Sequence, residues 1–174
     1  MNENIEIERK YIIKMPDVAR LETLDAYSHS DILQTYLVSD DGTTERVRRR
    51  AYDGAVRYYH TVKRRIDAMS CIEEEREICE REYGELLRRA DTSAVPIEKT
   101  RYTFAYQGLT VEIDRYARWD NIAVLEVELP SRDFKLELPD FISVLFEATG
   151  DFRFSNASLS KLFPSEADVV SYHL

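Results

Sequence analysis

Residues 5–13 read IEIERKYII, and apolar and charged side chains alternate along most of this stretch. A period of two residues is that of a β-strand, in which successive side chains point to opposite faces. One face of the predicted strand is largely apolar, and the other is ionised and consists of Glu6, Glu8 and Lys10. The stretch therefore predicts a strand that is amphipathic in an unusual way, because one face carries only charges.

Further strands follow along the chain, separated by residues that favour turns. Asp53-Gly54, for example, is typical of a two-residue hairpin turn between two antiparallel strands. These strands are predicted over residues 32–38, 44–52, 55–64, 71–78, 97–106, 109–117 and 123–129. Because short turns join most neighbours, the pattern predicts an antiparallel sheet.

Three segments carry the wider apolar spacing of helices. They cover residues 18–24, about 80–90 and 139–148, and Gly150 would end the third. No repeat, linker or low-complexity segment interrupts the pattern, and 174 residues can bury one sizeable core. The sequence therefore predicts an α+β fold, mainly antiparallel β, in a single domain over residues 1–174.

The composition excludes several classes of protein. A net charge of −9 argues against binding duplex nucleic acid through a generally basic surface. No stretch reaches the roughly 20 apolar residues of a membrane span, and the N-terminal MNENIEIERK is too charged for a secretory leader. Cys71 and Cys79 are predicted to be free thiols. We expect a cytoplasmic protein with no membrane partner.

The charges are segregated along the chain: residues 45–65 are strongly basic and 73–85 strongly acidic. Such runs are usually solvated faces. Like charges side by side on a sheet are destabilising, however, unless a group of opposite sign lies between them. The strand faces carry charges of mostly one sign each: Arg46 and Arg48; Lys63; Glu73 and Glu75; Lys99 and Arg101; Glu112 and Asp114; Glu126 and Glu128. The pattern favours a metal on the acidic side and a polyanion on the basic side.

If these faces share one interior, eight carboxylates meet six cations, and the formal charge is about −2. A polyphosphate would not enter such a cavity favourably on net charge alone. One or two divalent cations would reverse the sign near the carboxylates, and oxygen ligands without adjacent His or Cys favour Mg²⁺ or Mn²⁺ over Zn²⁺. Arg and Lys would then hold phosphate oxygens through charge-assisted hydrogen bonds.

The segment from Glu6 to Lys10 is similar to the ExExK motif that opens the CYTH superfamily, the triphosphate tunnel metalloenzymes, and the chain resembles its small bacterial-type inorganic triphosphatases. Further motifs follow in the family's order: RVR at 46–48, TVK at 61–63, ExE at 73–75, EKTRY at 98–102, EID at 112–114, EVE at 126–128 and FRFSNASL at 152–159. The resemblance covers roughly residues 4 to 161. It implies an eight-stranded antiparallel β tunnel barrel, with a charged interior and helices packed outside.

The resemblance also implies roles for the charged residues. The residues expected to bind the triphosphate are Lys10, Arg46, Arg48, Lys63, Lys99 and Arg101. Those expected to bind the metal are Glu6, Glu8, Glu126 and Glu128. A further acidic wall is expected to consist of Glu73, Glu75, Glu112 and Asp114. Lys99, close to the attacked phosphorus, and Glu8, through the metal, are the expected catalytic residues. Two features depart from the family pattern, because Cys71 stands where Arg is frequent, and Phe152 and Phe154 make the closing segment more apolar.

What the resemblance implies is a triphosphatase, which hydrolyses the terminal phosphate of a triphosphate with Mg²⁺ or Mn²⁺. The expected partner is a small-molecule triphosphate, preferably inorganic triphosphate. One alternative is a class IV-type adenylyl cyclase that makes cyclic AMP from ATP, although the sequence has no obvious set of residues to read a purine. Another is a non-catalytic polyphosphate- or nucleotide-binding module, which would not need so many carboxylates. Whether the protein is a monomer or a homodimer is left open.

Overall fold

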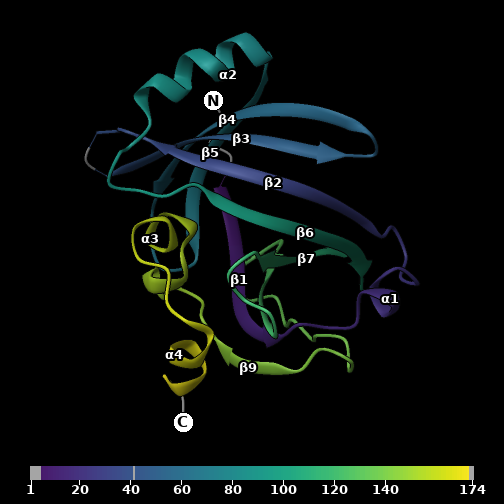
Figure 1. Ribbon diagram of the computed structural model, residues 1–174. Helices are drawn as coiled ribbons and strands as arrows, with labels where there is room; N and C mark the ends of the chain where they lie inside the picture. The colour runs from purple at the N-terminus through teal and green to yellow at the C-terminus, as the bar shows by residue number, and fades with distance from the viewer. Residues whose placement is uncertain (1–4, 41, 173–174) are drawn as a thin grey trace.

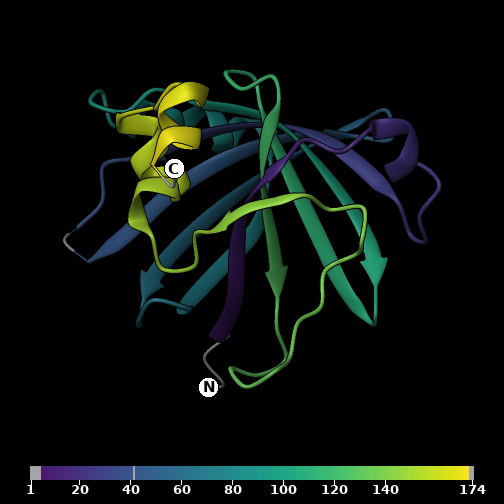
Figure 2. The same ribbon diagram turned by 90° about the horizontal axis from the view of Figure 1, so that it is seen from below.

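The computed structural model describes residues 5–40 and 42–172, which form an antiparallel barrel (Figures 1 and 2). Its strands are β1 (Ile5–Lys14), β2 (Ser28–Leu37), β3 (Thr43–Tyr52), β4 (Ala55–Arg65), β5 (Ser70–Ile78), β6 (Ile97–Tyr106), β7 (Leu109–Tyr116), β8 (Ile122–Glu128) and β9 (Val144–Glu147). They are ordered β5-β4-β3-β2-β6-β7-β8-β1-β9, and a further pairing of β1 with β5 closes eight of them into a ring. The predicted antiparallel barrel is confirmed.

One edge of β1 is shared between two partners. Pairing with β5 is limited to the start of β1, where Ile5 lies opposite Ile72 and Ile7 opposite Ser70. Farther along, the same edge pairs with β9, from Tyr11 to Ile13. The main-chain nitrogen of Ala148 also donates to the carbonyl oxygen of Lys10 at 2.8 Å. The short strand β9 therefore completes the part of β1 that β5 does not reach.

This arrangement makes the helix predicted over residues 139–148 wrong. Residues 144–147 form β9, and no helix is assigned to residues 139–143. The apolar spacing that suggested a helix serves a different purpose, because Ile142 packs on the outer core while Val144 is 42% exposed. The edge of β1 offers backbone groups that an extended segment can satisfy, and this tertiary pairing outweighs the local helical pattern.

The helices are short and lie outside the ring of strands: α1 (Val18–Leu21), α2 (Glu80–Leu86), η1 (Leu87–Arg89), η2 (Phe152–Phe154), α3 (Asn156–Lys161) and α4 (Glu166–Ser171). Helix α1 is shorter than predicted, whereas α2 and η1 together cover most of the predicted 80–90 segment. Helices α3 and α4 were not predicted, although each begins after a capping serine, Ser155 and Ser165. None of the described helices has the length and apolar character that a membrane crossing requires.

The apolar faces of the strands point outward and are covered in three places. Helix α2 packs Tyr83 against Val47 and Ile78. A second apolar cluster covers β1 and β6 to β8, and the segment containing Phe141 and Ile142 packs against it. A third cluster involves the C-terminal helices α3 and α4, which Figures 1 and 2 show side by side in yellow, away from α2. Because the apolar residues serve these outer contacts, the charged faces are left for the interior.

Gly150 fixes how the C-terminal segment meets the turn between β4 and β5. Its φ is +75°, and a Cβ at this position would lie 2.9 Å from the Cβ of Ala68. We expect Gly150→Ala to lower the free energy of unfolding by about 2 kcal/mol, through backbone strain and overpacking together. The matched control is Gly108→Ala, where φ is +76° but nothing lies within 4 Å, and it should cost only about 1 kcal/mol.

Urea unfolding followed by circular dichroism measures both variants. Equal losses of stability would contradict the close approach of Gly150 to Ala68.

Candidate functional site

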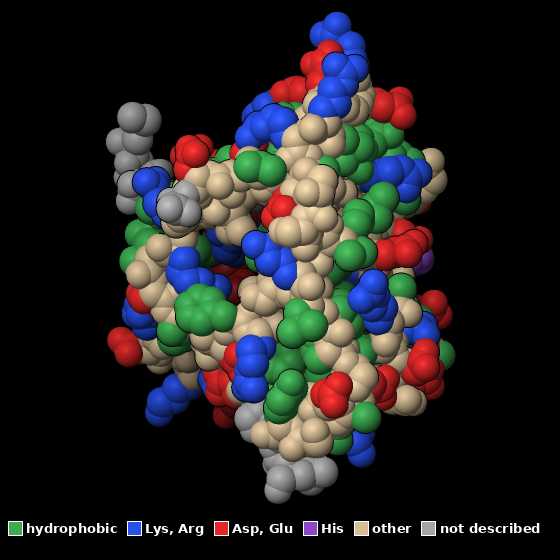
Figure 3. All heavy atoms as spheres, turned by 60° about the vertical axis from the view of Figure 1, so that its left-hand side comes forward, with side chains coloured by type: hydrophobic (Ala, Val, Ile, Leu, Met, Phe, Trp, Pro, Cys, Tyr) green, Lys and Arg blue, Asp and Glu red, His purple; other side chains and the backbone are tan. Residues whose placement is uncertain are grey.

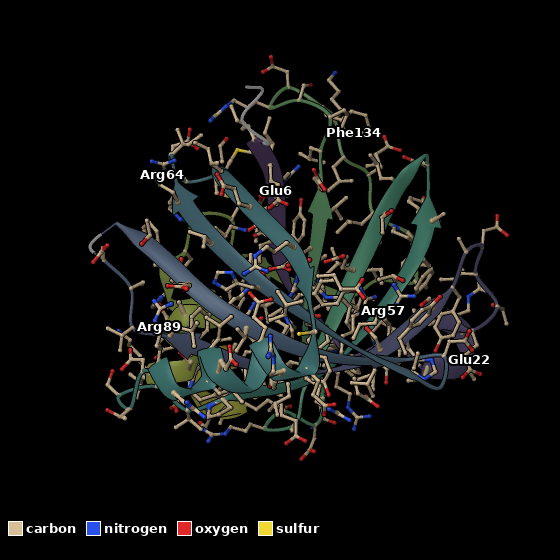
Figure 4. All side chains as sticks on the ribbon, turned by 90° about the horizontal axis from the view of Figure 1, so that it is seen from above. Glu6, Glu22, Arg57, Arg64, Arg89 and Phe134 are labelled. Carbon is tan, nitrogen blue, oxygen red and sulfur yellow. The ribbon has the colours of Figure 1, made fainter. Side chains whose placement is uncertain are left out.

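The barrel encloses a cavity of about 590 Å³ lined mainly by ionised side chains. Figure 3 shows a hollow with acidic side chains at depth and basic side chains around it. In Figure 4, Glu6 lies on β1 among the strands, whereas Glu22 and Arg89 lie at the periphery. All the predicted site residues line the cavity except Asp114, which lies behind its wall and is 1% exposed. The interior is therefore charged, as the strand pattern predicted.

The balance of charge in the wall differs from the sequence-based count. Among the described residues that line the cavity, seven carboxylates face eight Lys and Arg side chains, so the formal charge is +1 instead of −2. The difference comes from Asp114, which lies outside the lining, and from Arg50 and Arg65, which the sequence analysis missed. Both arginines continue the two-residue alternation of β3 and β4, and this signal was available in the sequence.

Asp114 positions two of the cations. Its carboxylate accepts hydrogen bonds from Lys99 Nζ at 2.5 Å, and from Arg101 Nε and Nη2 at 2.7 Å each. Burial raises the pKa of Asp114, but the charges of Arg101 and Lys99 outweigh it and hold that pKa below its usual value. Burial lowers the pKa of Lys99 to about 8, even though Asp114 favours the charged amine. Lys99 is thus a buried amine that loses its proton unusually easily.

Glu126 links β8 to cations on two other strands. Its Oε1 lies 2.8 Å from Lys10 Nζ, and its Oε2 accepts from Arg101 Nη2 at 3.2 Å. Burial raises the pKa of Glu126, yet Lys10 and Arg101 bring it well below its usual value. Arg101 also pairs with Glu112, whose pKa is raised because burial outweighs that attraction. These contacts fix the heads of Lys10 and Arg101 in the cavity wall.

A second group of ion pairs lies across β3, β4 and β5. Glu73 Oε2 is 3.2 Å from Lys63 Nζ, and Glu73 Oε1 is 3.4 Å from Arg46 Nη2. Arg48 pairs with Glu75, which also accepts a hydrogen bond from Thr61 Oγ1 at 2.7 Å. The acidic strand therefore holds the basic strands in place, as opposite charges do on neighbouring strands.

Tyr36 is a cavity residue that the sequence analysis missed. Its hydroxyl oxygen accepts a hydrogen bond from Gln34 Nε2 at 2.9 Å. With this bond in place, the O–H of Tyr36 is left to donate toward a ligand. Arg46 Nε is buried and has no hydrogen-bond partner in the described structure. Two donors are thus available for an anion at one point of the wall.

Glu6, Glu8 and Glu128 line the cavity from β1 and β8. Burial and the nearby charges of Glu73, Glu128 and Glu8 raise the pKa of Glu6, and Lys63 at 3.5 Å offsets them only in part. Within residues 5–40 and 42–172, no three Asp, Glu, His or Cys side chains converge into a preformed metal centre. The oxygen donors and the surplus negative charge around Glu6 nevertheless suit a hard divalent cation.

Both cysteines are free thiols, as predicted. Cys71 is buried, and its Sγ lies 3.7 Å from Glu6 Oε2. Burial raises the pKa of the Cys71 thiol, so it stays protonated at neutral pH and does not add a thiolate to the donor set. The carboxylates are therefore the anionic metal ligands that this wall offers.

The C-terminal segment contributes to the same cavity, through Phe152 and the residues at the start of α3. Asn156 accepts a hydrogen bond from the Tyr116 hydroxyl at 2.8 Å. Arg153 does not line the cavity, and its guanidinium Nη2 pairs with Asp151 Oδ2 at 2.6 Å. Asn156 therefore faces the site, whereas Arg153 does not.

Comparison with known proteins places this arrangement in a family. Residues 4–160 match the CYTH domain. An inorganic triphosphatase from Acetivibrio thermocellus is 33% identical over 157 residues, which are 90% of this chain and 93% of that protein. A crystal structure of the inorganic triphosphatase NE1496 is 26% identical, with a TM-score of 0.59 over 92% of this chain and 97% of that one.

The PH1819 protein from Pyrococcus horikoshii OT3 shares the fold, at 20% identity and a TM-score of 0.56 over 74% of this chain and 80% of that one. The chain belongs to the CYTH domain family. Membership of this family of triphosphate tunnel metalloenzymes implies that a divalent metal is required.

Proposed function

We propose that the protein hydrolyses the terminal phosphoanhydride bond of a triphosphate, with inorganic triphosphate as the preferred substrate and Mg²⁺ or Mn²⁺ as the metal. The observation that carries the proposal is the convergence of cations and carboxylates around one cavity of about 590 Å³. A triphosphate carries several negative charges, which the cations on β1, β3, β4 and β6 neutralise. The inorganic triphosphatase at 33% identity supports the same activity.

The substrate is held by the basic side chains of the wall: Lys10, Arg46, Arg48, Lys63, Lys99 and Arg101. Carboxylates already hold these cations in place, so little reorganisation is needed when the phosphates bind. Glu73, Glu75, Glu112 and Asp114 serve as positioning residues, because each pairs with one or more of these cations. The spare donors on Arg46 and Tyr36 supply two further hydrogen bonds to phosphate oxygens.

Glu6, Glu8, Glu126 and Glu128 would hold the divalent metal. Glu126 has a second role, because it also positions Lys10 and Arg101. When bound, the metal neutralises phosphate oxygens and so lowers the barrier to attack at phosphorus. The all-oxygen donor set supports Mg²⁺ or Mn²⁺ over softer metals.

In the chemical step, water attacks the terminal phosphorus and the bond to the bridging oxygen breaks. The bridging oxygen leaves with the bonding electron pair, so the products are orthophosphate and diphosphate. Lys99 in its neutral form accepts a proton from the attacking water, and its lowered pKa of about 8 supports this role. The other cations of the wall hold the leaving diphosphate.

Phosphate release tests the proposal and the role of Glu8. We expect release from inorganic triphosphate with Mg²⁺ or Mn²⁺, and none with excess chelator. Glu8→Gln should lower activity at limiting metal by about 10- to 100-fold, because a metal ligand is weakened. The control is Glu98→Gln, which changes an exposed carboxylate on the outer face of β6 and should leave activity unchanged.

Absence of phosphate release with either metal would refute the proposed function. Full activity of Glu8→Gln would instead contradict only the role of Glu8. If ATP yields cyclic AMP and diphosphate instead of orthophosphate, the cyclase alternative is the better description.

A further inference from the structure

A second cavity opens beside the charged tunnel, at the end where a hairpin joins β3 to β4. Its volume is about 380 Å³. The residues that line it are Ser28, Arg50, Tyr52, Arg57 and Tyr59. Figure 1 shows this hairpin on the side of the barrel opposite α3 and α4, and in Figure 4 Arg57 and Arg64 of β4 lie on opposite sides of the view. The cavity is therefore remote from the C-terminal segment.

Two like charges meet in this cavity. Arg50 and Arg57 lie directly opposite each other in the pairing of β3 with β4. Alternation places Arg50 on the same face as Arg48, and Arg57 on the same face as Lys63, so both point toward the interior. Like charges at such positions are destabilising on a sheet. An anion bound between the two guanidinium groups would remove that cost.

Arg50 differs from Arg46 and Arg48, its neighbours on the same face, in its partners. In the part of the chain that the structure describes, its guanidinium forms no ion pair with a carboxylate. Its Nε donates to Ser30 Oγ at 2.9 Å, and its guanidinium carbon lies 5.8 Å from the ring centroid of Tyr52. The remaining N–H groups of Arg50 are therefore free of an acidic partner.

Arg57 has an acidic partner, but the pair is open to solvent. Its Nη1 lies 3.3 Å from Glu77 Oε2, and the two side chains are 53% and 54% exposed. Exposed pairs of this kind are weak, so a bound anion can compete for the guanidinium. Among the described residues that line the cavity, two are arginines and three carry a hydroxyl group, which gives a formal charge of +2.

This set of donors selects a small oxyanion. A guanidinium presents a planar fork of N–H groups that matches two oxygens of a phosphate. The hydroxyl groups of Ser28, Tyr52 and Tyr59 can donate to the remaining oxygens. Orthophosphate, which the proposed reaction releases, has the charge and the tetrahedral oxygens that these donors require.

Arg50 connects the second cavity with the tunnel, because it lines both. Ile32 of β2 lies opposite both Arg50 and Lys99, so the second cavity begins at the level of Lys99. In the proposed reaction, Lys99 accepts a proton from the water that attacks the terminal phosphorus. The terminal phosphate therefore lies on the side of the tunnel that faces Arg50.

We propose that the cavity between Arg50 and Arg57 binds orthophosphate and is the route by which this product leaves the tunnel. This inference rests on the proposed function. After cleavage, orthophosphate moves from Lys99 to Arg50 and Arg57, while diphosphate stays with the cations of the main cavity. When free orthophosphate fills the second cavity, release of the next orthophosphate is blocked, although triphosphate can still bind.

Product inhibition of triphosphate hydrolysis tests the site. Orthophosphate should lower kcat more than it raises KM, because it does not occupy the place of the substrate. Arg57 does not line the main cavity. Arg57→Gln should raise the inhibition constant of orthophosphate about tenfold, which is the size of one lost hydrogen bond to a charged group. The inhibition constant of diphosphate should change by less than about twofold, because diphosphate is held elsewhere.

The matched control is Arg49→Gln, which removes an exposed arginine from the outer face of β3, next to Arg50. It should leave both inhibition constants within about twofold of wild type. Three outcomes would overturn the site while leaving the triphosphatase intact. They are purely competitive inhibition or no inhibition of the wild type by orthophosphate, an unchanged constant in Arg57→Gln, and an equal rise in Arg49→Gln.

If triphosphate is not hydrolysed, the proposed function fails, and titration calorimetry with orthophosphate decides the second cavity separately. Arg57→Gln should then weaken orthophosphate binding about tenfold, whereas Arg49→Gln should change it by less than about twofold. No binding to the wild type, or equal weakening in the two variants, would refute the site.

Discussion

Replacing Asp114 by Asn is expected to lower the free energy of unfolding by about 3–5 kcal/mol, because it removes the charge that compensates two buried cations. Asp114 and Lys99 each have 1% side-chain exposure, and Asp114 also bonds twice to Arg101. Arg101 keeps Glu112 and Glu126 as partners, so the cost falls mainly on Lys99. Denaturant unfolding of the full chain measures the change.

The control is Glu77→Gln, which breaks the exposed pair between Glu77 and Arg57. Surface pairs contribute about 1 kcal/mol or less, so this variant should stay close to wild type. Removing the lysine as well, in the double variant Lys99→Met and Asp114→Asn, should recover part of the loss, because no amine is then left uncompensated. A loss below about 1 kcal/mol in Asp114→Asn would contradict the structural role assigned to it.

Lys99→Met is expected to lower kcat by about 10²- to 10⁴-fold, which is the range for removal of a general base. Lys99→Arg separates charge from proton transfer, because the guanidinium stays protonated throughout the accessible pH range. It should therefore be nearly as inactive as Lys99→Met while keeping the positive charge. Single-turnover measurements with inorganic triphosphate and saturating metal report the chemical step directly.

The pH profile gives the sign of this effect. Burial lowers the pKa of Lys99 to about 8, so the neutral amine is the minor form below that pH and the major form above it. For the wild type, kcat should rise as pH increases through about 8, whereas Lys99→Arg should lose that rise. If Lys99→Arg keeps the wild-type profile, Lys99 does not accept the proton. If kcat of the wild type falls through the same range, the charged amine is the active form.

The strands and their inward faces were predictable because a period of two identifies both. The segment 97–106 was predicted with the bounds of β6, and the Asp53-Gly54 turn has the positive φ values, +50° and +72°, of the predicted hairpin. The start of β2 at Ser28 was missed, because the first residues of that strand are polar and become a strand only by pairing with β6. Alternation of side chains can be read within one strand, whereas the length over which a strand pairs depends on strands that are distant in the sequence.

The same reason accounts for β9. The four residues from Val144 to Glu147 are too few to show a strand pattern against the apolar spacing around them. They form a strand because they pair with an edge of β1, and that edge exists only in the closed barrel. The site was predictable to the extent that it follows alternation, which explains why Glu6, Arg48 and Glu128 were placed correctly on the cavity wall. The burial of Asp114 behind that wall depends on how the barrel closes, and the pattern along one strand does not contain it.

The short contact between β1 and β5 has a consequence for the dynamics of the ring. Among residues 5–40 and 42–172, three residue pairs make this contact, and one of them joins Glu6 to Cys71. The described part of β1 has fewer pairs with β5 than with β8, so transient opening of the cylinder should begin at the β1–β5 contact, where amide hydrogens would exchange sooner than along β8. Glu6 and Lys63 face each other across it at 3.5 Å. A polyanion and its counter-ion bound between Glu6 and Lys63 would hold β1 and the paired strands β4 and β5 together. Ligand binding in the interior would therefore stabilise the closed form of the barrel.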